Sequence, residues 1–484
     1  MRVSDAETEV RRLRVRLHLT AGRRPAKPSV LFLPPAAAKE CGFRYVRFHN
    51  MISKHTNLYT EDESGNPHID FDKFDKIFDK VIAAGYLPFF EVGFCPDALS
   101  KHIRTLCYYE ADTSVPNSFE KWDYLIKTMT EHIVERYGIN NARKWYFEVW
   151  NEPDLFYDGT MEDYFELYDH TAAAIKSVDS QLRVGGPATS KCLWINEFIE
   201  HIEKGSEVTG GKRGYCDFIS THAYPSDLAY LEGDYGDVNL LESNIMYCLY
   251  KKVKEDVDKS SLAGLPIIMG EWNSSAGPFA VNHDEKNNAA YIVKICDDLK
   301  DIIDGSMYWN LSDIYEEQDF HYIPFHGGYG LFNINDLPKS SYHAFELLNC
   351  MKGNQIKCEK SGNGSVKAIS AFDNENNCFR VLCYYYREPG KVNCGGENVN
   401  IILSGIESET ISFESDAVCD ESGSAYEWWV KIGSPQFINT DILAKLKEKS
   451  TMLHKNGALF KDDGAYRFSL DMQPGDIVLL QFRL

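Results

Sequence analysis

The sequence predicts an α/β fold, a (β/α)8 barrel of the TIM type, followed by a C-terminal antiparallel β-sandwich domain. Short apolar segments alternate with long amphipathic segments between residue 43 and about residue 350. This alternation is typical of parallel strands that helices cover on one side. After about residue 352 the helical rhythm stops. Short apolar runs between Gly, Asn and Asp turns then predict the sandwich.

Seven segments have the apolar character of buried parallel strands. They are 43–50, 87–94, 145–153, 182–187, 217–225, 266–272 and 306–313. A closed barrel needs eight strands, so the missing one is expected before residue 40, where 13–20 is a candidate. We therefore expect three parts: an atypical, arginine-rich segment (1–40) in which the first strand can be incomplete, the barrel (41–350) and the sandwich (351–484).

The helices between these strands show their own signals. Apolar residues share one helical face in segments 71–82 and 119–137, and Gly85 suits the end of the first of these helices. Thr160 and Asp163 form a helix N-cap pattern. In the C-terminal part, strands are expected at 367–372, 378–386, 398–403, 465–470 and 476–484, with one helical insertion at 440–453.

Composition and charge exclude several classes of partner. Lys and Arg total 51 against 72 Asp and Glu, a formal charge of −21, which disfavours binding to nucleic acids and to anionic membranes. The 13 cysteines never occur as C-x-x-C, so we expect reduced thiols, no metal site and no cofactor. A cytoplasmic protein that acts on a small neutral substrate fits these features, and assembly into a homo-oligomer is left open.

Polar and charged residues stand where the predicted strands end. Such residues are Arg47, His49, Asn151, Glu152, His222, Tyr224 and Glu271. The carboxyl ends of barrel strands face the active site, so we expect these side chains to meet there. In the segment WYFEVWNEPD (145–154), Glu152 should open onto the pocket. Glu148 lies deeper in the strand, and we expect it to be a buried acid paired with Arg44 or Arg47.

Glu152 and Glu271 close two strands of the predicted barrel in the same way. Two carboxyl groups that face each other across a barrel mouth are what glycoside cleavage requires. One protonates the leaving oxygen, and the other attacks the sugar or activates water. A catalytically silent sugar-binding protein on the same scaffold is the alternative from another functional class, and the presence of both acids disfavours it.

The segment WYFEVWNEPD resembles the acid/base segment of glycoside hydrolase family 39, which includes β-xylosidases and α-L-iduronidases. FRYVRFHN, STHAYP, GEWNSS and the long segment from SDIYEEQDF to AFELLN resemble the same family. SAYEWWVKIGSPQ is similar to its β-xylosidase branch. The resemblance runs from about Cys41 to the C-terminus and does not include residues 1–40.

The resemblance implies a retaining mechanism and a role for each site residue. Glu152 would be the general acid/base, and Glu271 the nucleophile. Asn151 would bind the sugar 2-hydroxyl, His222 would lie near Glu152, and Tyr224 near Glu271. The subsite for the non-reducing sugar would be lined by His49, Trp309, Glu316 and Glu317.

The substrate that the resemblance implies is a xyloside. An α-L-iduronide, a β-galactoside and an α-L-arabinofuranoside remain alternatives. Iduronate carries a carboxylate that Glu316 and Glu317 would repel unless a cation intervened, which favours the neutral xylose.

Overall fold

The computed structural model describes residues 17–20, 35–107, 110–226, 244–315, 321–388 and 395–484. Parallel strands close a barrel in the order β1-β12-β11-β10-β9-β8-β5-β2, and β1 pairs with β2 to complete the ring. These strands are β1 (Leu17–Thr20), β2 (Tyr45–Phe48), β5 (Leu87–Val92), β8 (Tyr146–Val149), β9 (Arg183–Thr189), β10 (Phe218–His222), β11 (Ile267–Trp272) and β12 (Gly305–Trp309). The predicted barrel is therefore confirmed.

The barrel strand expected before residue 40 is β1, which lies inside the candidate segment 13–20. Its Leu17 is in register with Ser306 of β12, and its Leu19 with Val46 of β2. Helix α11 ends at Cys350 and strand β13 begins at Asn354. The division of the chain after residues 40 and 350 stays a proposal.

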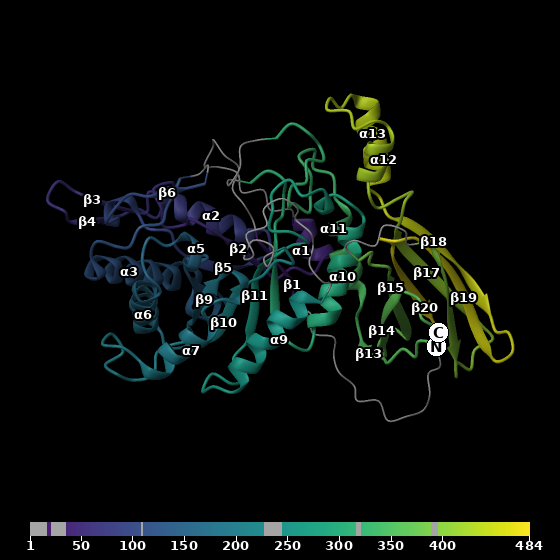
Figure 1. Ribbon diagram of the computed structural model, residues 1–484, viewed down its shortest axis with the longest axis horizontal. Helices are drawn as coiled ribbons and strands as arrows, with labels where there is room; N and C mark the ends of the chain where they lie inside the picture. The colour runs from purple at the N-terminus through teal and green to yellow at the C-terminus, as the bar shows by residue number, and fades with distance from the viewer. Residues whose placement is uncertain (1–16, 21–34, 108–109, 227–243, 316–320, 389–394) are drawn as a thin grey trace.

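Helices surround the barrel, as Figure 1 shows. They are α1 (Pro35–Glu40), α2 (Asp72–Ala83), α3 (Phe119–Tyr137), α4 (Ile139–Ala142), α5 (Pro153–Phe156), α6 (Met161–Val178), α7 (Ile195–Lys204), α9 (Ile245–Asp258), α10 (Asn287–Leu299) and α11 (Ser340–Cys350). The expected cap of α6 is present, since the side chains of Thr160 and Asp163 each accept a hydrogen bond from the other's backbone N–H. Two small hairpins, β3–β4 (Tyr59–Glu61, Pro67–Ile69) and β6–β7 (Thr105–Leu106, Ala111–Asp112), lie in the loops.

The barrel interior consists of an apolar layer below a polar one. The lower layer is a cluster that takes one side chain from each of six strands: Tyr45, Phe89, Tyr146, Phe218, Ile268 and Met307. Side chains on a strand alternate between its two faces, so the residues two positions later point into the barrel again. These are Arg47, Glu91, Glu148, Ser220, Gly270 and Trp309. The apolar layer thus fills the lower part of the barrel, and the charged groups lie directly above it.

The C-terminal part forms two antiparallel sheets, beside the barrel in Figure 1. The larger has the order β13-β14-β15-β20-β17-β18, and the smaller is β16-β19. Their strands are β13 (Asn354–Gln355), β14 (Lys367–Asp373), β15 (Cys378–Tyr384), β16 (Glu397–Ser404), β17 (Thr410–Val418), β18 (Leu453–Phe460), β19 (Ala465–Met472) and β20 (Ile477–Arg483). One apolar cluster joins side chains of both sheets, among them Ile401, Leu480 and Phe482. The predicted sandwich is confirmed.

The two parts of the chain are tied together. Lys286, at the start of α10, donates to Asp476 of the sandwich at 2.7 Å. Helices α12 (Tyr426–Lys431) and α13 (Thr440–Lys449) project from the sandwich and pack on the loop after β12, where Trp429 meets Phe325. In the described part of the chain, no helix combines the length and the apolarity that a membrane crossing requires.

A repeated contact joins successive helices of the barrel's outer ring. In each case a Phe and an Asp stand four residues apart, and a His from the next helix stacks on the Phe ring and pairs with the Asp carboxylate. The three sets are Phe71, Asp75 and His132; Phe119, Asp123 and His170; and Phe165, Asp169 and His201. Residues at i and i+4 share one helical face, which explains why one histidine ring reaches both. We call these sets the helix clasps.

We expect the helix clasps to stabilise the barrel. His170→Ala removes a ring stacked at 4.3 Å on Phe119 and an ion pair with Asp123, and should lower the free energy of unfolding by about 1 kcal/mol. In a chain of this size, that is a fall of about 2 °C in the thermal midpoint measured by calorimetry. The exposed His68 is the control, and His68→Ala should leave the midpoint unchanged. Equal midpoints for both variants would contradict a stabilising role.

Candidate active site

The chain turns sharply between the end of β8 and the start of α5, and this turn presents Glu152. Strand β8 ends at Val149, earlier than the predicted 145–153, because Trp150 and Glu152 have φ values of 67° and 44°. These left-handed conformations are uncommon for residues other than glycine and are typical of functional sites. The Glu152 N–H donates to Ala188 O of β9 at 2.8 Å, which fixes the turn, and Pro153 then starts α5.

The guanidinium of Arg47 lies at the centre of the site and is fully buried. Its Nε donates to Glu148 at 2.6 Å, and its Nη2 donates to Asn151 at 2.9 Å. Nη2 also lies 3.3 Å from Glu91, and Nη1 lies 3.4 Å from Glu271. One cation thus contacts four side chains, which come from three segments of the barrel: β5, β8 with the turn after it, and β11. Glu148 is buried and paired with Arg47, which confirms the prediction for it.

The surroundings of Glu152 favour its protonated form. Its side chain is 12% exposed, and Oε1 is 2.9 Å from Nδ1 of His222. Burial, reinforced by the nearby carboxylate of Asp154, raises the pKa of Glu152 to about 8. Burial and the charge of Arg47 lower the pKa of His222 to about 4, so this imidazole is neutral at pH 7. Glu152 is therefore an acid that carries its proton near neutral pH.

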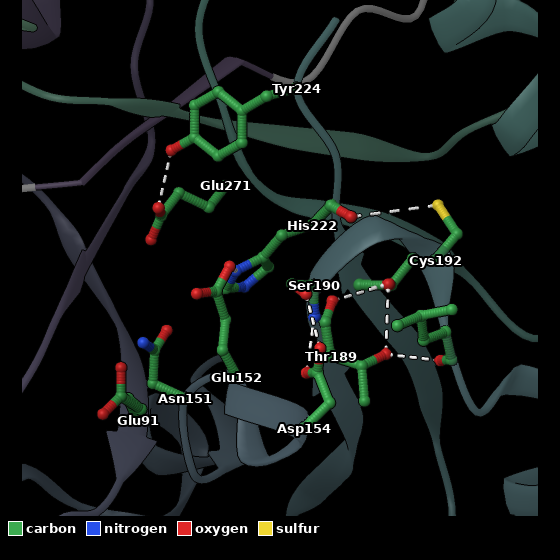
Figure 2. A network of polar contacts seen from close by, with 12 residues as sticks. Glu91, Asn151, Glu152, Asp154, Thr189, Ser190, Cys192, His222, Tyr224 and Glu271 are labelled. Atoms are coloured by element: carbon green, nitrogen blue, oxygen red, sulfur yellow. Dashed lines mark hydrogen bonds and ion pairs between the residues drawn. The ribbon is translucent and has the colours of Figure 1, made fainter. Parts of the chain in front are cut away.

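Glu271 has the opposite surroundings, because hydrogen-bond donors hold its carboxylate. Oε1 accepts a hydrogen bond from the hydroxyl of Tyr224 at 2.6 Å, and Oε2 accepts from Arg47 at 3.4 Å. Burial and the charge of Glu271 hold the pKa of Tyr224 well above its usual range, so this hydroxyl remains a donor. Figure 2 shows Tyr224 pointing at Glu271 from the side opposite Glu152. Groups that donate to a carboxylate stabilise its charged form.

His49 and Trp309 form another wall of the site. Burial opposes the charge of His49, but Glu91, which is hydrogen-bonded to Nδ1, raises the pKa of His49 to about 9. Its other nitrogen, Nε2, is 3.9 Å from Glu271 Oε2 and makes no hydrogen bond within the described residues. The ring of Trp309 lies 5.2 Å from that of His49. A protonated imidazole thus has one N–H left to donate.

The orientation of Asn151 follows from its partner. Arg47 only donates hydrogen bonds, so the amide oxygen of Asn151 must face it, and the amide NH2 group points elsewhere. Figure 2 shows this side chain beside Glu152. The amide can therefore donate to a ligand bound next to Glu152.

The two candidate acids face each other closely. One carboxylate oxygen of Glu152, one of Glu271 and one ring nitrogen of His222 all lie within 4.8 Å of one another. Three such ligand atoms are also what a divalent cation binds. However, Glu271 is already engaged by Arg47 and lies beside the imidazolium of His49, and both positive charges disfavour a metal ion.

Most residues predicted from the sequence meet at this site. They are His49, Asn151, Glu152, His222, Tyr224, Glu271 and Trp309. Glu316 and Glu317 lie outside the described residues. Two residues were not predicted. Glu91 contacts both Arg47 and His49, and an acid inside the apolar run LPFFEV was the signal for it. Asp154, in the first turn of α5, acts on the charge of Glu152.

Comparisons with known proteins identify the family of this chain. The model of the glycosyl hydrolases family 39 matches residues 32–467. A β-xylosidase of Caldicellulosiruptor saccharolyticus is 33% identical over 92% of this chain and 89% of its own. The crystal structure of a monomeric β-xylosidase from Caulobacter crescentus has a TM-score of 0.83 and 29% identity, over 97% of this chain and 99% of that one. The human α-L-iduronidase is 30% identical over 21% of this chain and 17% of its own.

The pairing of Glu148 leads to a prediction about stability. Glu148→Gln leaves Arg47 in a buried site with one carboxylate fewer, and should lower the free energy of unfolding by about 3 kcal/mol. The loss of stability should exceed the loss of turnover, since Glu148 is fully buried and paired with Arg47. Calorimetry together with kcat measured on the folded variant separates the two. A variant with the wild-type midpoint but a collapsed kcat would contradict this.

Proposed function

Since the chain belongs to family 39 of the glycosyl hydrolases, we propose that it is a retaining β-xylosidase. It would release xylose from the non-reducing end of β-1,4-xylo-oligosaccharides by double displacement. The observation that carries the proposal is the close pair of carboxyl groups with opposite surroundings, Glu152 protonated and Glu271 held by donors. Retaining glycosidases keep their two carboxyl groups only about 5–5.5 Å apart, whereas inverting ones leave room for a water molecule.

Each group has a role in the first step. The Glu271 carboxylate attacks C1 of the sugar while Glu152 gives its proton to the departing glycosidic oxygen. Arg47 and Tyr224 keep Glu271 oriented for the attack. In the second step Glu152, now a carboxylate, takes a proton from water, which attacks C1 and releases Glu271. The product keeps the anomeric configuration of the substrate.

Side chains of the site would hold the sugar. The amide of Asn151 would bind the 2-hydroxyl, next to the bond that breaks. The Nε2–H of His49 would bind another hydroxyl, and Trp309 would pack against the ring. Hydrogen-bond donors and an aromatic ring suit a neutral sugar. The proposed reaction needs no cofactor, because Glu152 and Glu271 supply both catalytic groups.

The preference for xylose is the finer part of the proposal. The β-xylosidase matches span 92% of the chain, whereas the match to the human α-L-iduronidase spans 21%. Glu316 and Glu317, if they line the subsite, would repel the carboxylate of an iduronide. A panel of nitrophenyl glycosides tests this. We expect the β-xyloside to be cleaved best, and a preference for α-L-iduronide, β-galactoside or α-L-arabinofuranoside would overturn it. Binding of sugars without any cleavage would indicate the silent sugar-binding protein.

We extend the proposal to a cytoplasmic location. Every cysteine in the described part of the chain is free, which suits a reducing compartment. The substrate would then be a short, imported oligosaccharide rather than polymeric xylan.

The two acids should fail differently when they are removed. Glu271→Ala leaves nothing to attack C1, so activity should be lost for every leaving group. Glu152→Ala removes the proton donor, which should cost about 10²- to 10⁴-fold for poor leaving groups and much less for nitrophenolate. Steady-state and burst kinetics with a series of aryl xylosides measure this difference.

Azide identifies the two roles independently. It needs no general base, so it should restore turnover of Glu152→Ala and give the β-xylosyl azide. In Glu271→Ala it can only replace the nucleophile and should give the α-xylosyl azide. NMR of the products distinguishes the anomers. Reversed products, or the same response from both variants, would contradict the assignment.

A further inference from the structure

Asp154 has no part in the mechanism above, yet it is built firmly into the site. It lies two residues after Glu152, in the first turn of α5. Its Oδ1 accepts from the N–H of Ser190 at 2.8 Å, and its Oδ2 accepts from the Ser190 hydroxyl. Figure 2 shows this pair to the right of Glu152, with dashed lines joining Asp154 to Ser190.

These bonds tie the turn that presents Glu152 to a rigid edge of the barrel. Ser190 follows directly after β9, which also accepts the N–H of Glu152 through Ala188. Thr189, the last residue of β9 and the one before Ser190, is fixed as well, because the hydroxyl of Thr221 on β10 donates to Thr189 O at 2.8 Å. Two contacts therefore hold the left-handed turn at Glu152 against the end of β9. One is the hydrogen bond from the Glu152 N–H to Ala188 O, and the other is the pairing of the Asp154 carboxylate with Ser190.

The negative charge of Asp154 favours the protonated form of Glu152, whereas the positive charges around Glu152 favour its carboxylate form. Arg47 and His49, from β2 and the loop after it, and Lys191, after β9, favour the carboxylate form of Glu152. His222 on β10 is neutral. Glu271 on β11 faces Glu152 but is engaged by Arg47. Asp154 is the negative group nearest in sequence, and it raises the pKa of Glu152 more than the three cations individually lower it.

We propose that Asp154 is a positioning residue that holds Glu152 in its turn and keeps it protonated until it gives its proton to the departing oxygen in the first step of the reaction. This rests on the proposed function, because only a general acid benefits from keeping its proton near neutral pH. The hydrogen bonds of the Asp154 carboxylate fix the position of Glu152, and its negative charge favours the protonated form of Glu152. Each effect can be removed by a separate substitution.

Three variants separate the parts. D154N removes the charge, but its amide can still accept from the Ser190 N–H and donate to the Ser190 hydroxyl. S190A keeps the charge and removes one hydrogen bond. D158N is the matched control, because Asp158 follows α5 closely but pairs with Arg104 at 2.6 Å. Each is compared with the wild type in the pH profile of kcat/KM on a nitrophenyl β-xyloside.

The basic limb of that profile reports the loss of the proton from Glu152, and it should lie near pH 8 in the wild type. In D154N the carboxylate form is no longer disfavoured, so the limb should move about one pH unit lower. S190A should lose about tenfold in kcat/KM at every pH without moving the limb. D158N should match the wild type. A D154N limb at the wild-type position, an S190A profile equal to wild type, or a D158N shift as large as that of D154N would overturn the proposal.

Infrared titration separates this proposal from the proposed function, because it needs no turnover. The carboxyl band that disappears in E152Q belongs to Glu152, and its loss with rising pH gives the titration midpoint. A lower midpoint in D154N than in the wild type supports the role of Asp154, even if no glycoside is cleaved. Equal midpoints would refute that role, even if the protein is an active xylosidase.

Discussion

The buried guanidinium of Arg47 is the contact on which the arrangement of the site depends. It comes from β2 and reaches Glu91 of β5, Glu148 of β8 and Glu271 of β11. A charge without partners inside a barrel costs several kcal/mol, and so does a buried carboxylate. Each group therefore requires the others, and the strands can only close in a register that brings them together. The apolar layer of the barrel interior lies below this cluster, excludes water from it and strengthens its electrostatic interactions.

The same cluster explains why two similar side chains have different chemistry. Arg47 and the imidazolium of His49 stand beside Glu271, whereas the carboxyl group of Glu152 lies beside neutral His222 and near the carboxylate of Asp154. Counting Arg47 and His49 as two positive charges and Glu91, Glu148 and Glu271 as three negative ones leaves a net charge of −1, with Glu152 protonated. An oxocarbenium-like transition state gains positive charge, and a site of this net charge stabilises it.

Much of the fold was predictable, because its parts give strong local signals. Seven barrel strands lie in apolar runs bounded by polar residues; Glu271 lies near the end of β11, and Glu152 lies in the turn that follows β8. Strand β18 was not predicted, because it lies at the edge of its sheet and its side chains are mostly exposed, so it has no apolar pattern. Asp154 was not recognised because its role depends on Ser190, which is distant in sequence and adjacent only in the fold.

Trapping the covalent intermediate tests most directly the claim that Glu271 attacks the sugar. A 2-deoxy-2-fluoro-β-xyloside with a good leaving group slows both steps but the second more, so the xylosyl-enzyme should accumulate. Mass spectrometry of the digested protein should then show one added fluoroxylosyl group per chain, on the peptide that contains Glu271. A label on Glu152 or on any other residue would contradict the assignment, and so would turnover of the reagent with inversion and no labelled peptide.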